Sequence, residues 1–210
     1  FGCVIAPAST LPAELWSLLV AREPVCLVAN LEDDSVTDFV LYTESSIDQA
    51  DSAAQALFER GKSDSEIVNN KIISVFWPVP KIVIVGTGPN AQALRESAAL
   101  LGWQTVITSD AGSAQGVIAG VSALDSIVIM IHDLDIAGAA LSAALSSNAG
   151  YIGALGSKRM QETRAEWLAY RGITDLTRIH GPAGINIGAK TPAEIAISIL
   201  AQALSVVKLG

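Results

Sequence analysis

The sequence has 210 residues, half of them hydrophobic, with a formal net charge of −8 and a pI near 4.7. This apolar share supplies a sizeable core and argues against an intrinsically disordered chain. The acidic balance, without any run of lysine or arginine, argues against non-specific binding to nucleic acid or to an anionic membrane surface, since both need dense positive charge.

Nothing in the pattern indicates secretion or a membrane span. The longest apolar runs, such as Ser126–Ile131, have the length of strands, whereas a membrane-spanning helix needs about 20 apolar residues. No secretory leader is visible. The two cysteines, Cys3 and Cys26, form neither a disulfide framework nor a metal-ligand spacing, so we expect no metal site and a cytoplasmic location.

We expect residues 1–77 to form a small α+β domain. The hydrophobic pattern predicts two strands and two helices there, at Val25–Leu31, Asp38–Thr43, Pro12–Arg22 and Asp48–Arg60. The strands are predicted to pair across an acidic turn at residues 32–35. The segment Phe76–Pro80 contains two prolines, which interrupt any ladder or helix, so it is expected to be a stiff joint between domains.

Residues 78–210 are expected to form a Rossmann-like α/β domain with a doubly wound parallel sheet. Short apolar runs alternate with helical stripes, as in sheets with helices on both faces. The predicted strands and helices include Lys81–Gly86, Gln104–Thr108, Ser126–Ile131, Leu134–Leu145 and Thr163–Arg171. A last helix follows Thr191, which with Pro192 and Glu194 forms a capping box.

The first candidate site is a glycine turn between a strand and a helix. Gly86, Gly88 and Ala91 fit the G-x-G-x-x-G/A pattern, in which the glycines allow a tight turn and a close approach of the backbone to phosphate. Asp110, just after the next strand, has the place of a carboxylate that binds a ribose hydroxyl. The same turn also occurs in such folds for packing alone.

A second candidate is the strand end at His132 and Asp133. Parallel sheets bind ligands at the carboxyl ends of their strands, and an imidazole there can bind a ligand or exchange protons. Asp133 is explained as simply by a helix N-cap, and His132 by a structural role.

The third candidate is the segment Tyr151–Arg159, in which Gly156 frees the backbone and Ser157 can cap the next helix. Lys158 and Arg159 would then lie in the first helical turn, where cations oppose the helix dipole. Such a local conflict is expected at an anion site. The alternative is a pair of solvated cations on a helix face.

The fourth candidate is the irregular loop before the last helix, which holds Gly181, Pro182 and Gly184. Glycine-bearing loops of this length are often functional, because their backbone N–H groups can face an anion. The chain shows no Ser–His–Asp spacing, nucleophile elbow, Walker lysine or Cys/His cluster. The sequence therefore favours binding over self-contained catalysis.

In this order, the motifs "GTGPNA", "MIHD", "YIGALGSKR" and "HGPAGINIGAKTPAEIAISILAQ" resemble those of the XdhC/CoxI family, accessory proteins of xanthine dehydrogenase and related molybdenum hydroxylases. The resemblance runs from Lys81 to the C-terminus. Cys3 is either a displaced counterpart of the family's Cys-Gly-Gly motif or unrelated to it.

The resemblance implies a maturation chaperone that binds molybdenum cofactor, as molybdopterin or its dinucleotide form, and helps its sulfuration or its insertion into a hydroxylase. A cysteine desulfurase is an implied partner, and a homodimer stays open. By position, the ligand cleft would be formed by Gly86, Gly88, His132, Asp133, Gly156, Ser157, Lys158 and Arg159, and closed by Gly181, Pro182 and Gly184. The alternatives are an NAD(P)-dependent oxidoreductase and a nucleotide-binding regulatory protein.

Overall fold

The computed structural model describes residues 10–32 and 35–209, so Cys3 and the centre of the predicted acidic turn lie outside the described residues. Contacts divide the chain into two compact units, one ending at Pro78 and the other beginning at Val79.

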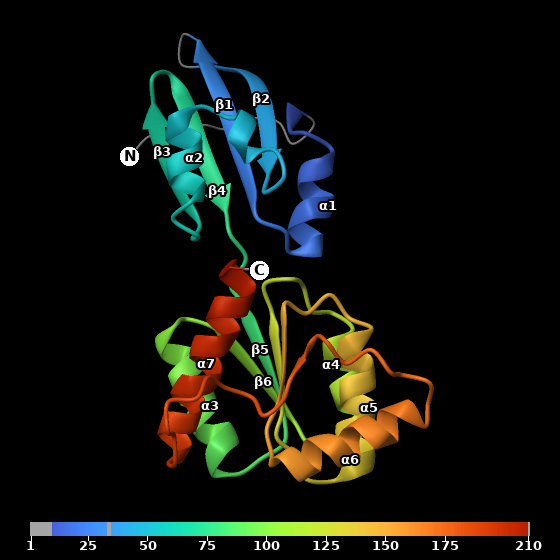
Figure 1. Ribbon diagram of the computed structural model, residues 1–210. Coiled ribbons are helices and arrows are strands. Elements are labelled where there is room, and N and C mark those ends of the chain that lie inside the picture. Colours follow the sequence, from blue (N-terminus) through green and yellow to red (C-terminus); the bar gives the residue numbers. More distant parts are fainter. Residues whose placement is uncertain (1–9, 33–34, 210) are drawn as a thin grey trace. The chain divides into compact units, whose positions relative to one another are not determined.

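The first unit is a four-stranded antiparallel sheet of order β2-β1-β4-β3 with helices beside it (Figure 1). Its elements are α1 (Glu14–Ala21), β1 (Val25–Glu32), β2 (Ser35–Thr43), the 3-10 turn η2 (Ile47–Gln49), α2 (Ser52–Phe58), β3 (Asp64–Val68) and β4 (Lys71–Phe76). Leu57 and Phe58 of α2 join a core cluster with Cys26 and Ile73 of the sheet. Burial, with a smaller effect of Asp51, raises the pKa of the Cys26 thiol to about 11, so this thiol is a packing group and not a nucleophile.

Two expectations for this unit were wrong or incomplete. The single helix predicted at Asp48–Arg60 is broken, because the Asp51 carboxylate accepts a hydrogen bond from Ala54 N at 3.0 Å and starts a new helix there. The β3–β4 hairpin was not predicted. Its signal is Asn69-Asn70, which adopt φ of 49° and 58°, as in a type I′ turn.

The second unit is a five-stranded parallel sheet of order β6-β5-β7-β8-β9, which confirms the predicted fold class. Its elements are β5 (Lys81–Val85), α3 (Pro89–Leu100), β6 (Gln104–Thr108), α4 (Ala111–Ile118), β7 (Ser126–Ile129), α5 (Leu134–Leu145), β8 (Tyr151–Ala154), α6 (Lys158–Ala169), β9 (Ile179–His180) and α7 (Pro192–Leu209). The strand order reverses between β5 and β7, so the topological switch point lies at their carboxyl ends.

Helices cover both faces of this sheet, α3 and α7 on one side and α4, α5 and α6 on the other (Figure 1). Along β5, Ile82 and Ile84 pack in the cluster with α3 and α7, whereas Val83 and Val85 pack in the cluster with α4 and α5. Because both faces are buried, the strand is apolar throughout instead of alternating.

Among the described residues one helix, α7, is long and apolar enough to cross a membrane by length and composition. Ala196, Ile199, Leu200 and Ala203 of this helix are buried in the cluster with α3. Core helices of globular proteins pass the same test, and α7 has that packing. This helix was predicted from its capping box, but polar residues such as Gln202 interrupt its apolar pattern, so its sequence does not form one long apolar run.

One buried carboxylate joins two segments at the amino ends of the parallel strands, which we call the amino edge of the sheet. Asp125 is fully buried; its two oxygens accept hydrogen bonds from Lys81 N at 2.7 Å and from Ser122 N at 2.8 Å. The side chain thus joins the start of β5 to the turn before β7.

We expect Asp125→Ala to lower the free energy of unfolding by about 2–4 kcal/mol, because two buried N–H groups lose their acceptor. Urea unfolding measures the loss. Asp125→Asn keeps one acceptor oxygen and is expected to lose less. Changes below about 0.5 kcal/mol in both variants would contradict this role.

The predicted capping box of α7 is confirmed and makes stability depend on pH. Glu194 Oε2 accepts hydrogen bonds from Thr191 N at 2.9 Å and Lys190 N at 2.8 Å, and these bonds lower the pKa of the Glu194 carboxyl. A lowered folded-state pKa adds stability above the unfolded pKa, and that stability is lost as the pH falls through the folded pKa.

We therefore expect Glu194→Gln to weaken the dependence of stability on pH between about pH 5 and pH 3. The wild-type urea midpoint should fall more steeply over this range than that of the variant. Parallel curves for the two proteins would show that Glu194 makes no such contribution.

Candidate functional site

The predicted site residues gather at the carboxyl edge of the parallel sheet. Because β5, β7, β8 and β9 run in the same direction, the segments that follow them emerge side by side. These segments begin at Gly86, Met130, Leu155 and Gly181.

The glycine turn after β5 has two glycines with different roles. Gly86 has φ +135° and donates from its backbone N to Thr108 O at 2.7 Å; an added Cβ would lie 2.9 Å from Ile131 N. Gly88 has φ +98° and ψ −172°, and an added Cβ would meet nothing within 4 Å. Gly86 therefore allows the close packing of two strand ends, whereas Gly88 faces open space.

The helix that follows this turn differs from the helices beside it. No side chain caps α3, whereas Asp110, Asp133 and Ser157 cap α4, α5 and α6. The carboxylates of Asp110 and Asp133 each accept a backbone hydrogen bond at 2.9 Å, and the bond from Ser113 lowers the pKa of Asp110. The helix-cap interpretation of Asp133 is confirmed. A hydrogen bond from a ribose hydroxyl to Asp110 stays a prediction.

We expect Gly88→Ala to cost about 1–3 kcal/mol of stability, because its φ and ψ are nearly exclusive to glycine. Gly86→Ala should cost more, since the new Cβ would also press on the backbone of Ile131. Urea unfolding of both variants provides the comparison. Equal losses would show that the contact with the β7 end does not matter.

A polar cavity of about 270 Å³ lies between the end of β7 and the first turns of α6. Three predicted residues, His132, Ser157 and Arg159, line it together. Its lining also holds residues that the sequence analysis did not single out: Leu134, Met160, Thr163 and Arg164. No carboxylate is among these lining residues, so the side chains of the polar cavity carry the charge of two arginines.

Arg164 is the main residue that sequence reasoning missed. Its side chain is only 2% exposed, and its guanidinium donates to Leu155 O at 2.7 Å and to Ile131 O at 2.9 Å. No carboxylate in the described ranges lies within ion-pair distance, and burial lowers the pKa of Arg164. Its place four residues before the buried Leu168 was the available signal, since that spacing puts a cation on the core face of α6.

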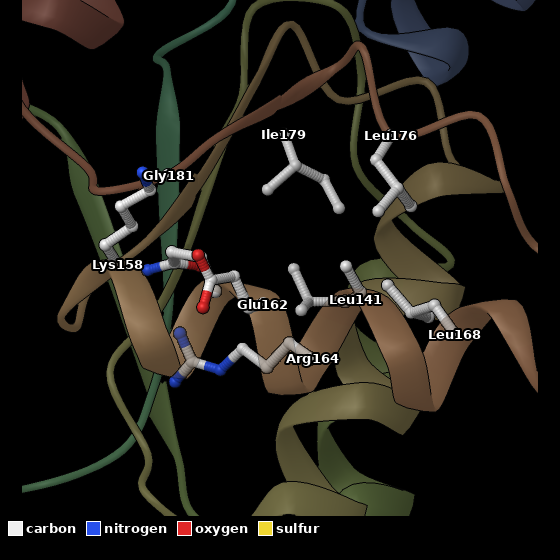
Figure 2. A pocket seen from close by; sticks show the side chains of 10 residues that line it. Leu141, Lys158, Glu162, Arg164, Leu168, Leu176, Ile179 and Gly181 are labelled. Atoms are coloured by element: carbon white, nitrogen blue, oxygen red, sulfur yellow. The ribbon is translucent and has the colours of Figure 1, made fainter.

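An apolar cavity of about 320 Å³ adjoins the same helix on another side (Figure 2). Leu141, Leu168, Leu176 and Ile179 supply its apolar wall. Figure 2 shows Lys158 near Gly181 at the other end of the cavity, with Glu162 and the Arg164 guanidinium also toward that end. Lys158 and Arg159, adjacent in sequence, therefore line two different cavities.

The loop after β9 is fastened to α7. Gly184 N and the Tyr151 hydroxyl both donate to Gln202 Oε1, each at 2.7 Å, and Tyr151 stacks on His180 with ring centroids 5.1 Å apart. The Gly181–Pro182 peptide bond is cis. The loop therefore has a defined path over the sheet edge.

The structure thus divides the predicted residues into groups. His132, Ser157 and Arg159 share the polar cavity, and Lys158 and Gly181 line the apolar one. The remaining predicted residues line neither of these two cavities: Gly86, Gly88, Ala91, Asp110, Asp133, Gly156, Pro182 and Gly184. Gly156 still shapes the polar cavity, because its φ of +138° turns the chain into Ser157.

The fold defines a class: a doubly wound α/β domain with a glycine turn at its switch point, beside a cavity lined by basic side chains. The pattern of the family described as the XdhC Rossmann domain matches residues 82–203, and the chain belongs to this family.

Two curated relatives from Escherichia coli (strain K12) are each 31% identical to this chain. The uncharacterized protein YqeB aligns over 156 residues and the molybdenum cofactor insertion chaperone PaoD over 136. The alignments cover 64% and 62% of this chain but only 28% and 41% of those proteins.

A solved structure described as a xanthine dehydrogenase from Bacillus halodurans matches with a TM-score of 0.59 at 24% identity. The match covers 93% of this chain and 63% of that one. At this level of identity the similarity establishes a shared fold.

Proposed function

We propose that this protein binds molybdenum cofactor at the carboxyl edge of its parallel sheet and takes part in the maturation of a molybdenum hydroxylase. The observation that carries the proposal is the polar cavity, where His132, Arg159 and Arg164 meet without a carboxylate in the lining. Membership of the XdhC family and the similarity to a chaperone that inserts this cofactor support the same ligand.

The residues present fit an anionic pterin cofactor. Gly88 leaves open space in front of the uncapped N-terminus of α3, where backbone N–H groups and the helix dipole favour a phosphate. Beside this turn, Thr108 Oγ1 is buried without a hydrogen-bond partner in the part of the chain described. Lys158 and Arg159 are exposed at the start of α6, where a negative ligand would offset their conflict with the helix dipole.

In this proposal the protein holds and protects the cofactor instead of transforming it. The cofactor supplies the metal chemistry that the target hydroxylase later uses. The cations at the cavity hold the ligand's anionic groups, while the loop fastened by Gln202 shields one side of the edge. Insertion into a xanthine dehydrogenase-type enzyme, and sulfuration with a cysteine desulfurase, are the steps we infer for it in a cytoplasmic setting.

The test is retention of cofactor by the purified protein. Full-length wild type produced in cells that make molybdenum cofactor should co-purify with it, as the fluorescence of its oxidised pterin product reports. Lys158→Glu together with Arg159→Glu should retain at least about tenfold less, the scale of lost charge-assisted hydrogen bonds.

A well-folded wild type that never carries the pterin would overturn the proposal. Saturable binding of NAD(P) in its place, followed by tryptophan fluorescence, would favour the oxidoreductase reading based on Gly88 and Asp110. The four tryptophans make that titration practicable.

A further inference from the structure

Arg164 is a buried cation at the carboxyl ends of the strands, and Glu162, which lines the apolar cavity with it, is not among its hydrogen-bond partners. The residue is 2% exposed, yet its two hydrogen-bond partners among the described residues are carbonyl oxygens, which carry only partial negative charge. A buried cation without a counter-ion is costly, so such groups are normally paired. The described part of the chain offers no carboxylate within ion-pair distance.

The two carbonyls place Arg164 between the segments that follow β7 and β8, which carry His132 and Ser157. Ile131 directly precedes His132, and Leu155 precedes Gly156 and Ser157. One guanidinium therefore ties the ends of β7 and β8 together and sets the distance between the imidazole and the N-terminus of α6. The same side chain contributes to the wall of both cavities, the polar one with Arg159 and the apolar one with Glu162.

We propose that Arg164 is a positioning and charge-matching residue for an oxyanion, of the phosphate class, that occupies the polar cavity beside His132, Ser157 and Arg159. Arg159 lies at the exposed mouth and meets the oxyanion directly. Arg164 holds the ends of β7 and β8 at the correct spacing. Its positive charge lies in the wall of the cavity and attracts the oxyanion. The identity of the full ligand rests on the proposed function, but the oxyanion subsite can be tested without that ligand.

Inorganic phosphate is the probe, with the full chain in solution. The protein has two histidines, His132 in the polar cavity and His180 stacked on Tyr151. Imidazole NMR should show a saturable shift of the His132 signal on phosphate addition, with His180 as internal reference and His132→Gln for assignment. Chloride at the same ionic strength should not reproduce the shift, since screening alone has no saturable site.

Arg164→Met should weaken phosphate binding about tenfold or more, because both the charge and the tie between the strand ends are lost. Arg164→Lys keeps the charge but not the planar fork that reaches both carbonyls, so its affinity should be intermediate. If Arg164→Met does not fold, the wild-type titration and the lysine variant decide the question. Wild-type affinity in the lysine variant would then overturn the proposal.

Arg178 provides a control that makes the same type of contact at an exposed position. It also uses its guanidinium to hold backbone carbonyls, those of Leu145, Ser147 and Ala149, but before β9 at the amino edge of the sheet. Arg178→Met should lower thermal stability while changing phosphate affinity by less than about twofold. Equal losses of affinity in the two methionine variants would show that Arg164 acts through general stability and would overturn the inference.

The inference and the proposed function fail separately. Cofactor that co-purifies normally with Arg164→Met, in a protein that does not bind phosphate at the polar cavity, would overturn the inference alone. Phosphate binding that depends on Arg164, in a wild-type protein that never carries cofactor, would support the inference and count against the proposed function.

Discussion

The carboxyl edge of the parallel sheet depends on the two hydrogen bonds that the buried guanidinium of Arg164 donates to Ile131 O and Leu155 O. Those oxygens belong to residues that closely follow the neighbouring strands β7 and β8. One side chain therefore fixes the positions at which the loops after both strands begin. Burying a guanidinium without an ion-pair partner is unfavourable, and among the described residues the two carbonyl oxygens offset part of that cost. His132, Ser157 and Arg159 line the same cavity as Arg164.

The two ends of the parallel strands each bury one charged side chain, Asp125 at the amino ends and Arg164 at the carboxyl ends. At the amino ends of the strands the buried carboxylate of Asp125 accepts hydrogen bonds from two backbone N–H groups, one on each oxygen. At the carboxyl edge α4, α5 and α6 are capped by their own side chains, whereas α3 begins at Gly88 without one. The uncapped helix start and the cavity lined by Arg159 and Arg164 therefore lie together at the carboxyl ends of the strands, where doubly wound sheets bind ligands. This asymmetry is consistent with the family to which the chain belongs and with the cofactor of its relative PaoD.

Prediction from the sequence worked where a pattern is local. The apolar run of β5 ending at a glycine, the capping box of α7 and the cap at Ser157 are each decided by residues within a few positions of one another, and the structure has all three. It was wrong for the helix expected at Asp48–Arg60, where the Asp51 side chain competes for the backbone, and it missed the hairpin that turns at Asn69-Asn70. For the site, sequence reasoning named the loops, but it could not tell that Lys158 and Arg159 line separate cavities.

The sequence by itself determined the class of fold, the glycine turn after β5 and the helix caps, because periodicity and turn chemistry act over short distances. Only the tertiary structure decided which cations share a cavity with His132, and that Arg164 is buried between two strand ends. The spacing from Leu168 places Arg164 on the core face of α6, but its hydrogen bond to Ile131, 33 residues earlier, depends on how separate segments pack.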